Sequence, residues 1–122
     1  MARKILVVDD DDLVRMLIKR ALELKGFEVV ESDDGDTAVD MVDRYADIGL
    51  VILDLKMPRM GGKEAYAAIR LMRPGLKCIV SSAYINENDE EELSACGVNA
   101  FLKKPYLIED LYRTVDSVAV EG

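Results

Sequence analysis

Five short apolar runs of strand length divide the chain, and each is followed by a segment whose apolar residues recur with helical spacing. This alternation is typical of βα units, whose strands pair in parallel because each connecting helix carries the chain back to the same end of the sheet. The third run (IGLVIL) is apolar throughout, as expected for a central strand covered on both faces. Right-handed crossovers then predict an α/β fold with helices on both faces of an open sheet. The expected strands are 4–9, 27–32, 48–53, 77–82 and 99–103.

The expected helices differ in the strength of their signals. The clearest is 12–25, which has an aspartate before its first turn and Gly26 after its last. Its apolar stripe consists of Val14, Leu17, Ile18, Ala21 and Leu24. In 86–95, by contrast, an acidic run leaves only Leu93 and small residues to dock on a core, so we predict a weakly held, mobile helix. Pro58 and a glycine pair predict a turn after the third strand. The other helices are expected after Gly35, over 65–72 and from Leu107 or Ile108 to Val118.

Length and composition fit a single globular domain over residues 1–122, since a chain of this size buries roughly two-thirds of its extended surface. The sequence is 50% hydrophobic and 33% charged, which excludes the disordered and fibrous classes. Cys78 and Cys96 do not form a CxxC motif, so we expect free thiols in a reducing compartment. Neither a signal peptide nor an apolar run of ~20 residues is found, and we expect a cytoplasmic protein without a membrane partner.

Charge and the missing histidines narrow the function further. The formal net charge of -8 argues against a nucleic-acid partner, because phosphate backbones are bound by clustered Lys and Arg. The chain has 0 histidines, so it cannot supply a phosphohistidine, an imidazole base or the usual zinc site. A metal bound here must be a hard ion with oxygen ligands.

Polar side chains gather where the expected strands end. In an open parallel sheet, ligands bind outside the carboxyl ends of the strands, so these residues should converge on one edge. Carboxylates held close together repel, so such a site must either raise a pKa or recruit a cation. Mg²⁺ is a cation that such oxygen donors favour. The residues are Asp9, Asp10, Asp54, Ser81, Ser82, Lys103 and Lys104.

An aspartate after a strand can also be a helix cap or a solvated loop residue. We assign that role to Asp11 and Asp12, because a helix must be capped there. Asp54 is different, since Leu53 and Leu55 flank it at the end of a buried strand. A carboxylate is costly to place in such surroundings without a partner. The sequence therefore favours a functional role for Asp54.

Four motifs together resemble the receiver domain of bacterial response regulators (CheY-like superfamily), over nearly the whole chain. They are ILVVDD at 5–10, LDLKMPRMGG at 53–62, SSAY at 81–84 and the pair Lys104-Pro105. The resemblance implies a doubly wound, five-stranded parallel sheet of order 2-1-3-4-5, the flavodoxin-like (βα)5 fold. It also implies the phosphoacceptor of a two-component phosphorelay. Such a domain is not an enzyme acting on other molecules, because it catalyses only its own phosphoryl transfer and autodephosphorylation.

The resemblance assigns a role to each matching residue. Asp54 is expected to be the phosphoacceptor, and Lys104 to pair with the phosphoryl group. Mg²⁺ would bind Asp54, Asp10 and the backbone carbonyl of Lys56. Asp9 would act on the ion mainly through water. The chemistry suits these residue types, because a carboxylate is a nucleophile at neutral pH and phosphoryl transfer depends mainly on positioning and charge stabilisation.

The switch residues depart from the commonest family pattern. Ser82, the expected switch hydroxyl, stands where threonine is more usual, and Phe101 stands where tyrosine is frequent. Lys56 and Tyr84 are expected to border the path of the attacking water and so to tune dephosphorylation. The expected phosphodonor is a sensor histidine kinase or a histidine phosphotransfer protein. Output to a downstream protein or attached domain would pass through the fourth helix, fifth strand and fifth helix.

Three other functions share part of this pattern. A flavodoxin-like electron carrier would bind an anionic cofactor, which the acidic loop after the first strand would repel. A phosphatase of the haloacid dehalogenase type would have a second acid where Lys56 stands. A phosphorylation-independent, receiver-like scaffold for protein interactions is the strongest alternative, and the intact set of Asp10, Asp54, Ser82 and Lys104 argues against it.

The sequence leaves the context of this module open. Its glycine pair, its PGLK segment and its SSAY segment resemble receivers attached to hybrid sensor kinases. A stand-alone regulator and a module of a longer chain are both compatible with these features. Neither the cognate kinase nor the output partner can be identified from them.

Overall fold

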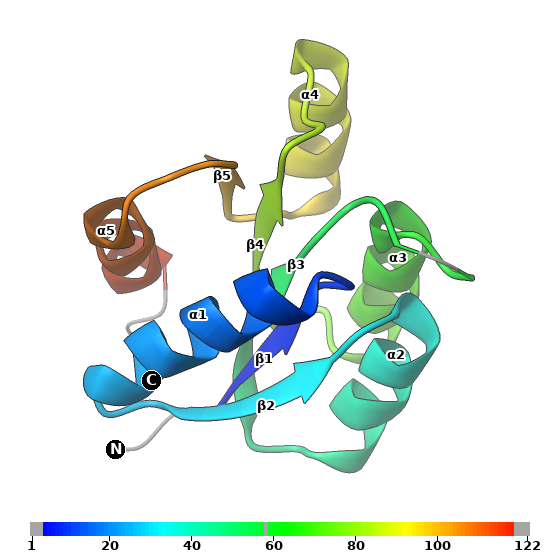
Figure 1. Ribbon diagram of the computed structural model, residues 1–122. Helices are drawn as coiled ribbons and strands as arrows, with labels where there is room; N and C mark the ends of the chain where they lie inside the picture. Colours follow the sequence, from blue (N-terminus) through cyan, green and yellow to red (C-terminus); the bar gives the residue numbers. More distant parts are fainter. Residues whose placement is uncertain (1–3, 58, 119–122) are drawn as a thin grey trace.

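Five strands alternate with five helices within residues 4–57 and 59–118, the part of the chain that the computed structural model describes (Figure 1). The strands are β1 Lys4–Val8, β2 Glu28–Ser32, β3 Ile48–Leu53, β4 Lys77–Ser82 and β5 Ala100–Lys103. The helices are α1 Asp12–Leu24, α2 Gly35–Arg44, α3 Gly62–Met72, α4 Glu87–Cys96 and α5 Ile108–Val118. Every expected strand is present, with its ends shifted by no more than one residue. Pro58, predicted to mark a turn, lies outside the described residues.

The strands form one parallel sheet of order β2-β1-β3-β4-β5, which confirms the predicted fold. Val8, at the end of β1, is paired with Ser32 on one side and with Leu53 on the other. The ladder continues one residue further, because Asp9 N donates to Ser32 O at 3.1 Å and Asp54 N donates to Val8 O at 3.0 Å. The residues that follow β1 and β3 therefore lie side by side at one edge of the sheet.

Helices cover both faces of this sheet (Figure 1). α1 and α5 pack on one face, where Ile18 and Leu111 join a buried apolar core. α2, α3 and α4 lie on the other face, where Ala38, Ile69 and Leu93 join a second core. Successive side chains of a strand point to opposite faces, so each central strand contributes to both cores. None of the helices in the described ranges is long and apolar enough to cross a membrane.

α1 presents a narrower buried face than its sequence predicts. Asp11 caps the helix by accepting hydrogen bonds from N–H groups of the first turn, as expected. Leu17 and Leu24, both expected on the buried stripe, are instead 53% and 70% exposed. A helix turns by about 100° per residue, so a sheet-facing side centred on Ile18 and Leu22 leaves these two leucines in solvent. The buried residues of α1 are Ile18, Ala21 and Leu22.

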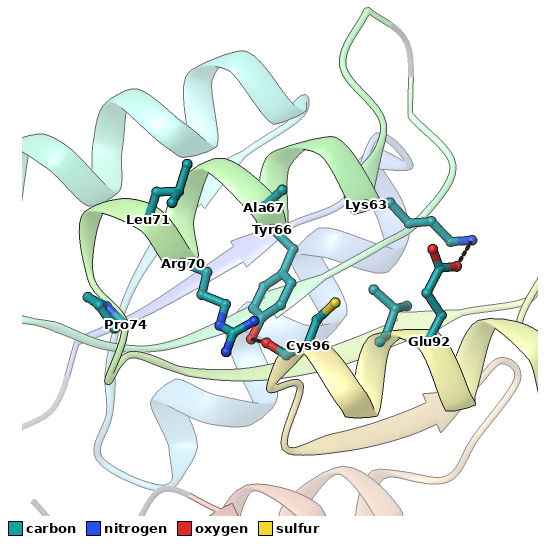
Figure 2. A pocket seen from close by; sticks show the side chains of 9 residues that line it. Lys63, Tyr66, Ala67, Arg70, Leu71, Pro74, Glu92 and Cys96 are labelled. Carbon is teal, nitrogen blue, oxygen red and sulfur yellow. Dashed lines mark hydrogen bonds and ion pairs between the residues drawn. The ribbon is translucent and has the colours of Figure 1, made fainter.

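Polar contacts join α4 to α3 beside one buried apolar anchor (Figure 2). Leu93 is the buried residue of α4. Lys63 Nζ on α3 lies 2.7 Å from Asp89 Oδ1 and 3.0 Å from Glu92 Oε1. Near the other end of α4, the Tyr66 hydroxyl donates to a backbone carbonyl at 3.3 Å. The scarcity of apolar anchors in α4 is confirmed, while its mobility stays a prediction.

Candidate functional site

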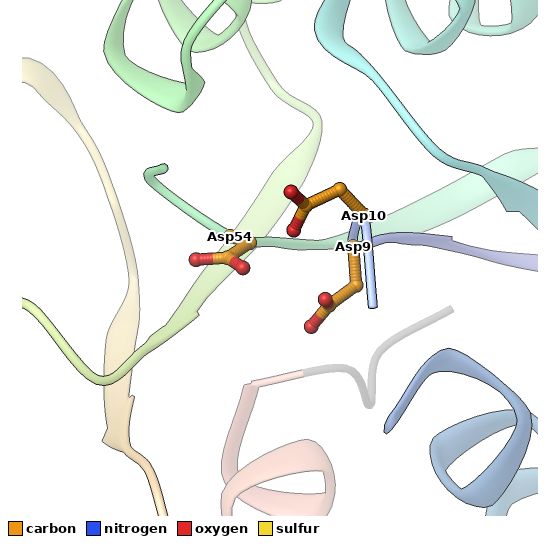
Figure 3. A group of neighbouring side chains, drawn as sticks. All are labelled: Asp9, Asp10 and Asp54. Carbon is orange, nitrogen blue, oxygen red and sulfur yellow. The ribbon is translucent and has the colours of Figure 1, made fainter. Parts of the chain in front are cut away.

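Three carboxylates meet where β1 and β3 end (Figure 3). Asp9 and Asp10 follow β1 and Asp54 follows β3, and one oxygen of each lies within 4.8 Å of the others. Asp9 is 1% exposed and Asp54 is 7% exposed, whereas Asp10 is open to solvent. The sheet order produces this arrangement, because β1 and β3 are neighbours and end at the same edge. The acidic cluster predicted from the strand ends is therefore present.

Lys104 joins this cluster from the segment after β5. Its backbone N–H donates to Ser82 O at 3.0 Å, which continues the pairing of β5 with β4. Its ammonium Nζ lies 2.5 Å from Asp9 Oδ2 and 3.3 Å from Asp54 Oδ2. The lysine therefore bridges the two buried carboxylates and partly compensates their charge.

Burial and ion pairing act together on the ionisation of this cluster. Burial raises the pKa of Asp9, although the Lys104 ammonium and the Asp11 N–H, which donates to Asp9 Oδ1 at 2.9 Å, oppose that rise. Burial acts to lower the pKa of Lys104, but the hydrogen bonds and charges of Asp9 and Asp54 outweigh it, so its pKa is raised. Lys104 is thus held as an ammonium among acidic side chains. A site of this kind attracts a further cation and an anionic group bound to it.

The two serines at the end of β4 make different contacts. Ser82 is fully buried, and its Oγ accepts a hydrogen bond from the Tyr84 N–H at 3.2 Å. Within the described residues, no hydrogen bond joins Ser82 to the carboxylates, and its switch role stays a prediction. Ser81 Oγ lies 3.0 Å from the hydroxyl oxygen of Tyr106. Because side chains alternate along a strand, the two hydroxyls leave β4 on opposite faces.

A cavity of about 320 Å³ opens over the acidic cluster. Lys56 and Tyr84, predicted to tune dephosphorylation, both line it, and Lys56 Nζ lies 4.7 Å from the centroid of the Tyr84 ring. This is the geometry of a cation–π contact. The two side chains thus form a pair beside the proposed reaction centre. The lining residues are Asp9, Asp10, Asp11, Val14, Asp54, Lys56, Ala83, Tyr84 and Lys104.

Three residues near this site could not be assigned a role from the sequence. Arg15 Nη1 on α1 donates to the backbone oxygen of Asp9 at 2.7 Å. Gly62 begins α3 directly behind Asp54, where a Cβ atom would overlap the Asp54 backbone. Tyr106 follows Lys104-Pro105, and its hydroxyl contacts Ser81 Oγ. The glycine pair was a signal for Gly62, whereas the sequence held no sign of the partners of Arg15 and Tyr106.

Comparison with known proteins identifies the family to which this fold belongs. The response regulator receiver domain family matches residues 5–116. The chain belongs to this family. The response regulator protein TrrA from Thermotoga maritima, solved in complex with Mg²⁺-BeF, is a structural relative of this receiver domain. It has a TM-score of 0.84 and 30% sequence identity, and the match covers 94% of this chain and 97% of that chain.

Curated relatives place the same domain in larger proteins. The CAI-1 autoinducer sensor kinase/phosphatase CqsS of Vibrio cholerae is 36% identical over 106 residues, which is 84% of this chain and 15% of the relative. The transcriptional regulatory protein PdtaR of Mycobacterium tuberculosis is 33% identical over 115 residues, which is 93% of this chain and 55% of that protein. The receiver domain therefore spans well under two-thirds of either relative. Sensor kinases and transcriptional regulators both occur among them.

Family membership and the acidic cluster give this chain a phosphoacceptor role in two-component signalling. The cluster is suited to holding a metal ion, since three carboxylate oxygens converge there. The chain is thus a signalling domain of the CheY-like type, as its motifs indicated. Receiver domains work with histidine kinases and with downstream partners.

Proposed function

We propose that Asp54 accepts the phosphoryl group from the phosphohistidine of a sensor histidine kinase or a histidine phosphotransfer protein. The choice of Asp54 over Asp9 rests on the hydrogen-bond partners of these two buried carboxylates. Both Asp9 oxygens are taken up, one by Lys104 at 2.5 Å and one by a backbone N–H at 2.9 Å. Among the described residues, Asp54 Oδ1 accepts a single, long contact of 3.4 Å from the Lys56 N–H. Asp54 therefore keeps an oxygen available for attack while its other oxygen faces the ammonium.

We infer that the ion at this cluster is Mg²⁺. All side-chain donors are carboxylate oxygens and the chain has 0 histidines, which is a hard donor set. Asp10, Asp54 and the backbone carbonyl of Lys56 would hold the ion, with Asp9 acting mainly through water. When bound, Mg²⁺ neutralises charge that develops on the phosphoryl oxygens during transfer. The Mg²⁺-BeF complex of TrrA supports this assignment.

The residues of the chain then perform the transfer by position and charge. An Asp54 oxygen forms a bond to phosphorus while the phosphorus–nitrogen bond to the donor imidazole breaks. The electron pair of that bond stays on the imidazole nitrogen. Once this nitrogen is protonated, the donor is left with a neutral histidine side chain. Lys104 turns from Asp9 to a phosphoryl oxygen, and the Ser82 hydroxyl leaves the Tyr84 N–H for another.

Exposed apolar residues on α1 support a protein as the phosphodonor. Leu13, Met16 and Leu17 are 60%, 54% and 53% exposed, and they lie in the first turns after Asp10 and Asp11. Exposed apolar patches of this kind mark protein contact sites. A donor helix seated there would bring its phosphohistidine to the cavity. Output would leave by the face of α4, β5 and α5, since α4 has a single buried anchor.

Further properties of the domain follow from this proposal. Residues 1–122 would act as one signalling domain, with no chemistry beyond its own phosphorylation and autodephosphorylation. Cys78 and Cys96 are both free thiols, which suits the reducing cytoplasm. The net charge of -8 argues against a nucleic-acid partner, because phosphate backbones attract basic proteins.

Acetyl phosphate tests the assignment without a kinase. With Mg²⁺, the wild-type chain should gain the mass of one phosphoryl group, whereas Asp54→Ala or excess EDTA should prevent it. Asp43→Ala, which removes an exposed aspartate near the C-terminal end of α2, at the opposite edge of the sheet, should be modified like the wild type. Mg²⁺ should also raise the melting temperature by binding linkage, and Asp10→Asn should remove most of that rise. Equal adduct in Asp54→Ala would overturn the assignment, and no adduct in the wild type would favour the phosphorylation-independent scaffold.

A further inference from the structure

The hydroxyl of Ser81 is a buried polar group whose partner in the described chain is a tyrosine. Ser81 is 1% exposed, and its Oγ lies 3.0 Å from the hydroxyl oxygen of Tyr106. A buried hydroxyl that loses its partner keeps the full penalty of desolvation, so this contact holds both side chains in place. The Tyr106 ring packs at the same time against the apolar core beneath α1 and α5. Tyr106 is therefore fixed at both its ring and its hydroxyl.

Tyr106 stands close to the reacting groups in both sequence and space. It is separated from Lys104 by one residue, Pro105. Burial raises the pKa of the Tyr106 phenol, and the charges of Lys104, Asp9 and Asp54 all act on it. The phenol is thus within range of the charges of the cluster, although it does not line the cavity above it. It is placed to act on the site through Lys104 rather than directly.

The segment that carries Lys104 is attached to β4 at two points, one on each side of Pro105. The Lys104 N–H donates to Ser82 O at 3.0 Å, and the Tyr106 hydroxyl contacts Ser81 Oγ at 3.0 Å. Only Pro105 lies between the two attached residues, so this part of the backbone has little freedom. Lys104 must nevertheless move its ammonium from Asp9 toward Asp54 when a phosphoryl group arrives. With the backbone fixed, this movement is confined to the side-chain torsions of the lysine.

We propose that Tyr106 is a positioning residue for phosphoryl transfer: its hydroxyl, bonded to Ser81, fixes the segment that presents the Lys104 ammonium to Asp54. This inference rests on the proposed phosphorylation of Asp54. Without the hydroxyl, the Lys104 backbone would sample more positions, and its ammonium would meet the phosphoryl oxygens less often. The reaction depends on such positioning, so its rate should report the loss.

A double-mutant cycle on the two hydroxyls tests the contact. Tyr106→Phe and Ser81→Ala each remove one oxygen and keep the remaining side chain. The rate constant of phosphorylation by acetyl phosphate at saturating Mg²⁺ should fall by roughly three- to tenfold in each single variant. In the double variant it should fall no further, because both substitutions remove the same contact. A wild-type rate in Tyr106→Phe, or effects that multiply in the double variant, would overturn the proposal.

Two further readouts separate positioning from a general loss of stability. In a Lys104→Met background, Tyr106→Phe should leave the remaining rate unchanged, because the residue acts through Lys104. In metal-free protein, the Lys104 ammonium should give a slowly exchanging NMR signal that broadens in Tyr106→Phe. The Lys63 ammonium, paired with Asp89 and Glu92 away from this site, is the control and should not change. An unaltered Lys104 signal, or an equal rate loss in the Lys104→Met background, contradicts positioning.

The failure of this inference and the failure of the proposed function give different results. If wild-type protein takes up no phosphoryl group, Asp54 is not the acceptor and both ideas fall. If the wild type is phosphorylated and Tyr106→Phe keeps pace with it, only the role of Tyr106 is wrong. Should Tyr106→Phe fold poorly by circular dichroism, Ser81→Ala gives the same decision, because it removes the other half of the contact.

Discussion

Lys56 and Tyr84 contact each other beside the proposed phosphoacceptor, with the ammonium 4.7 Å from the ring centroid. Such a pair would shield the aspartyl phosphate from the attacking water. The double variant Lys56→Asn, Tyr84→Glu should therefore lose its phosphoryl group faster, by roughly two- to fivefold, the factor equivalent to a cation–π contact of about 0.5–1 kcal/mol. The decay of the phosphorylated mass after removal of acetyl phosphate measures this. Tyr84→Phe keeps the ring and should keep the wild-type lifetime, and equal lifetimes for all three proteins would show that the pair does not shield.

The two cysteines should differ sharply in reactivity. Cys78 is buried on β4, and burial raises the pKa of its thiol to about 12, while Cys96 is exposed. Because this folded pKa lies above that of the unfolded chain, the neutral thiol stabilises the fold at lower pH. That contribution is lost as the pH rises from the unfolded pKa toward 12. Iodoacetamide at mildly alkaline pH should modify Cys96 in the native protein and Cys78 only after unfolding, as read by peptide mass. Equal native reactivity would contradict the burial.

The positions of residues that directly follow a strand could be predicted from the sequence. The contacts of side chains whose partners lie in loops could not. Asp9, Asp54 and Lys104 follow strands directly, so parallel pairing alone brings them together. Ser82 also ends a strand, but its hydroxyl is taken up by an N–H of the next loop. The partner of Tyr106 depends on how the segment after β5 folds back on β4, which no local pattern encodes.

Among the helices and strands, α4 is the element whose attachment matters most for the proposed switching. Lys63 bridges Asp89 and Glu92, and its hydrogen bond lowers the pKa of Asp89. A lowered carboxyl pKa stabilises the fold above the unfolded pKa, and this contribution is lost as the pH falls through the folded pKa. The ion pairs thus hold α4 to α3 at neutral pH.

Lys63→Met should consequently loosen α4 without unfolding the domain. Amide hydrogen exchange over α4 should become severalfold faster at neutral pH, while exchange in β1 and β3 stays as slow as in the wild type. Lys19→Met is the matched control, because Lys19 bridges Glu23 and Glu31 on the other side of the sheet. If the control loosens α4 as much, or if Lys63→Met leaves its exchange unchanged, the ion pairs do not hold the helix.

Helices and strands could be predicted from the sequence where their apolar residues followed one clear pattern. The run at β3 matches the structure at both ends, because an unbroken apolar segment has only one way to be buried in a parallel sheet. The buried stripe of α1 was assigned too broadly, since Leu17 and Leu24 have helical spacing but face solvent. Periodicity shows that a helix has an apolar side. It does not show how wide a strip the sheet covers.

Across the whole molecule, β5 connects the reaction centre to the proposed output face. Lys104 follows this strand directly, Leu102 is buried in the core beneath α1 and α5, and Phe101 packs against the core beneath α2, α3 and α4. A change at the lysine can therefore reach both layers through four residues of one strand. Phe101 is partly buried in the unphosphorylated domain.

Phosphorylation should change the α4, β5 and α5 face less in this protein than in its Phe101→Tyr variant. Phenylalanine gains burial when it turns inward and leaves no hydroxyl unpaired, so the resting protein should already populate the inward position appreciably. A tyrosine side chain at this position would occupy the outward, solvent-facing position more often, so phosphorylation would move it further. Amide chemical shifts with and without beryllofluoride and Mg²⁺ measure this, since beryllofluoride stands in for the phosphoryl group on Asp54. The shifts over residues 84–106 should be smaller in the wild type than in Phe101→Tyr. Large shifts confined to α1 and α2, with residues 84–106 unmoved in both proteins, would show that output does not leave through this face.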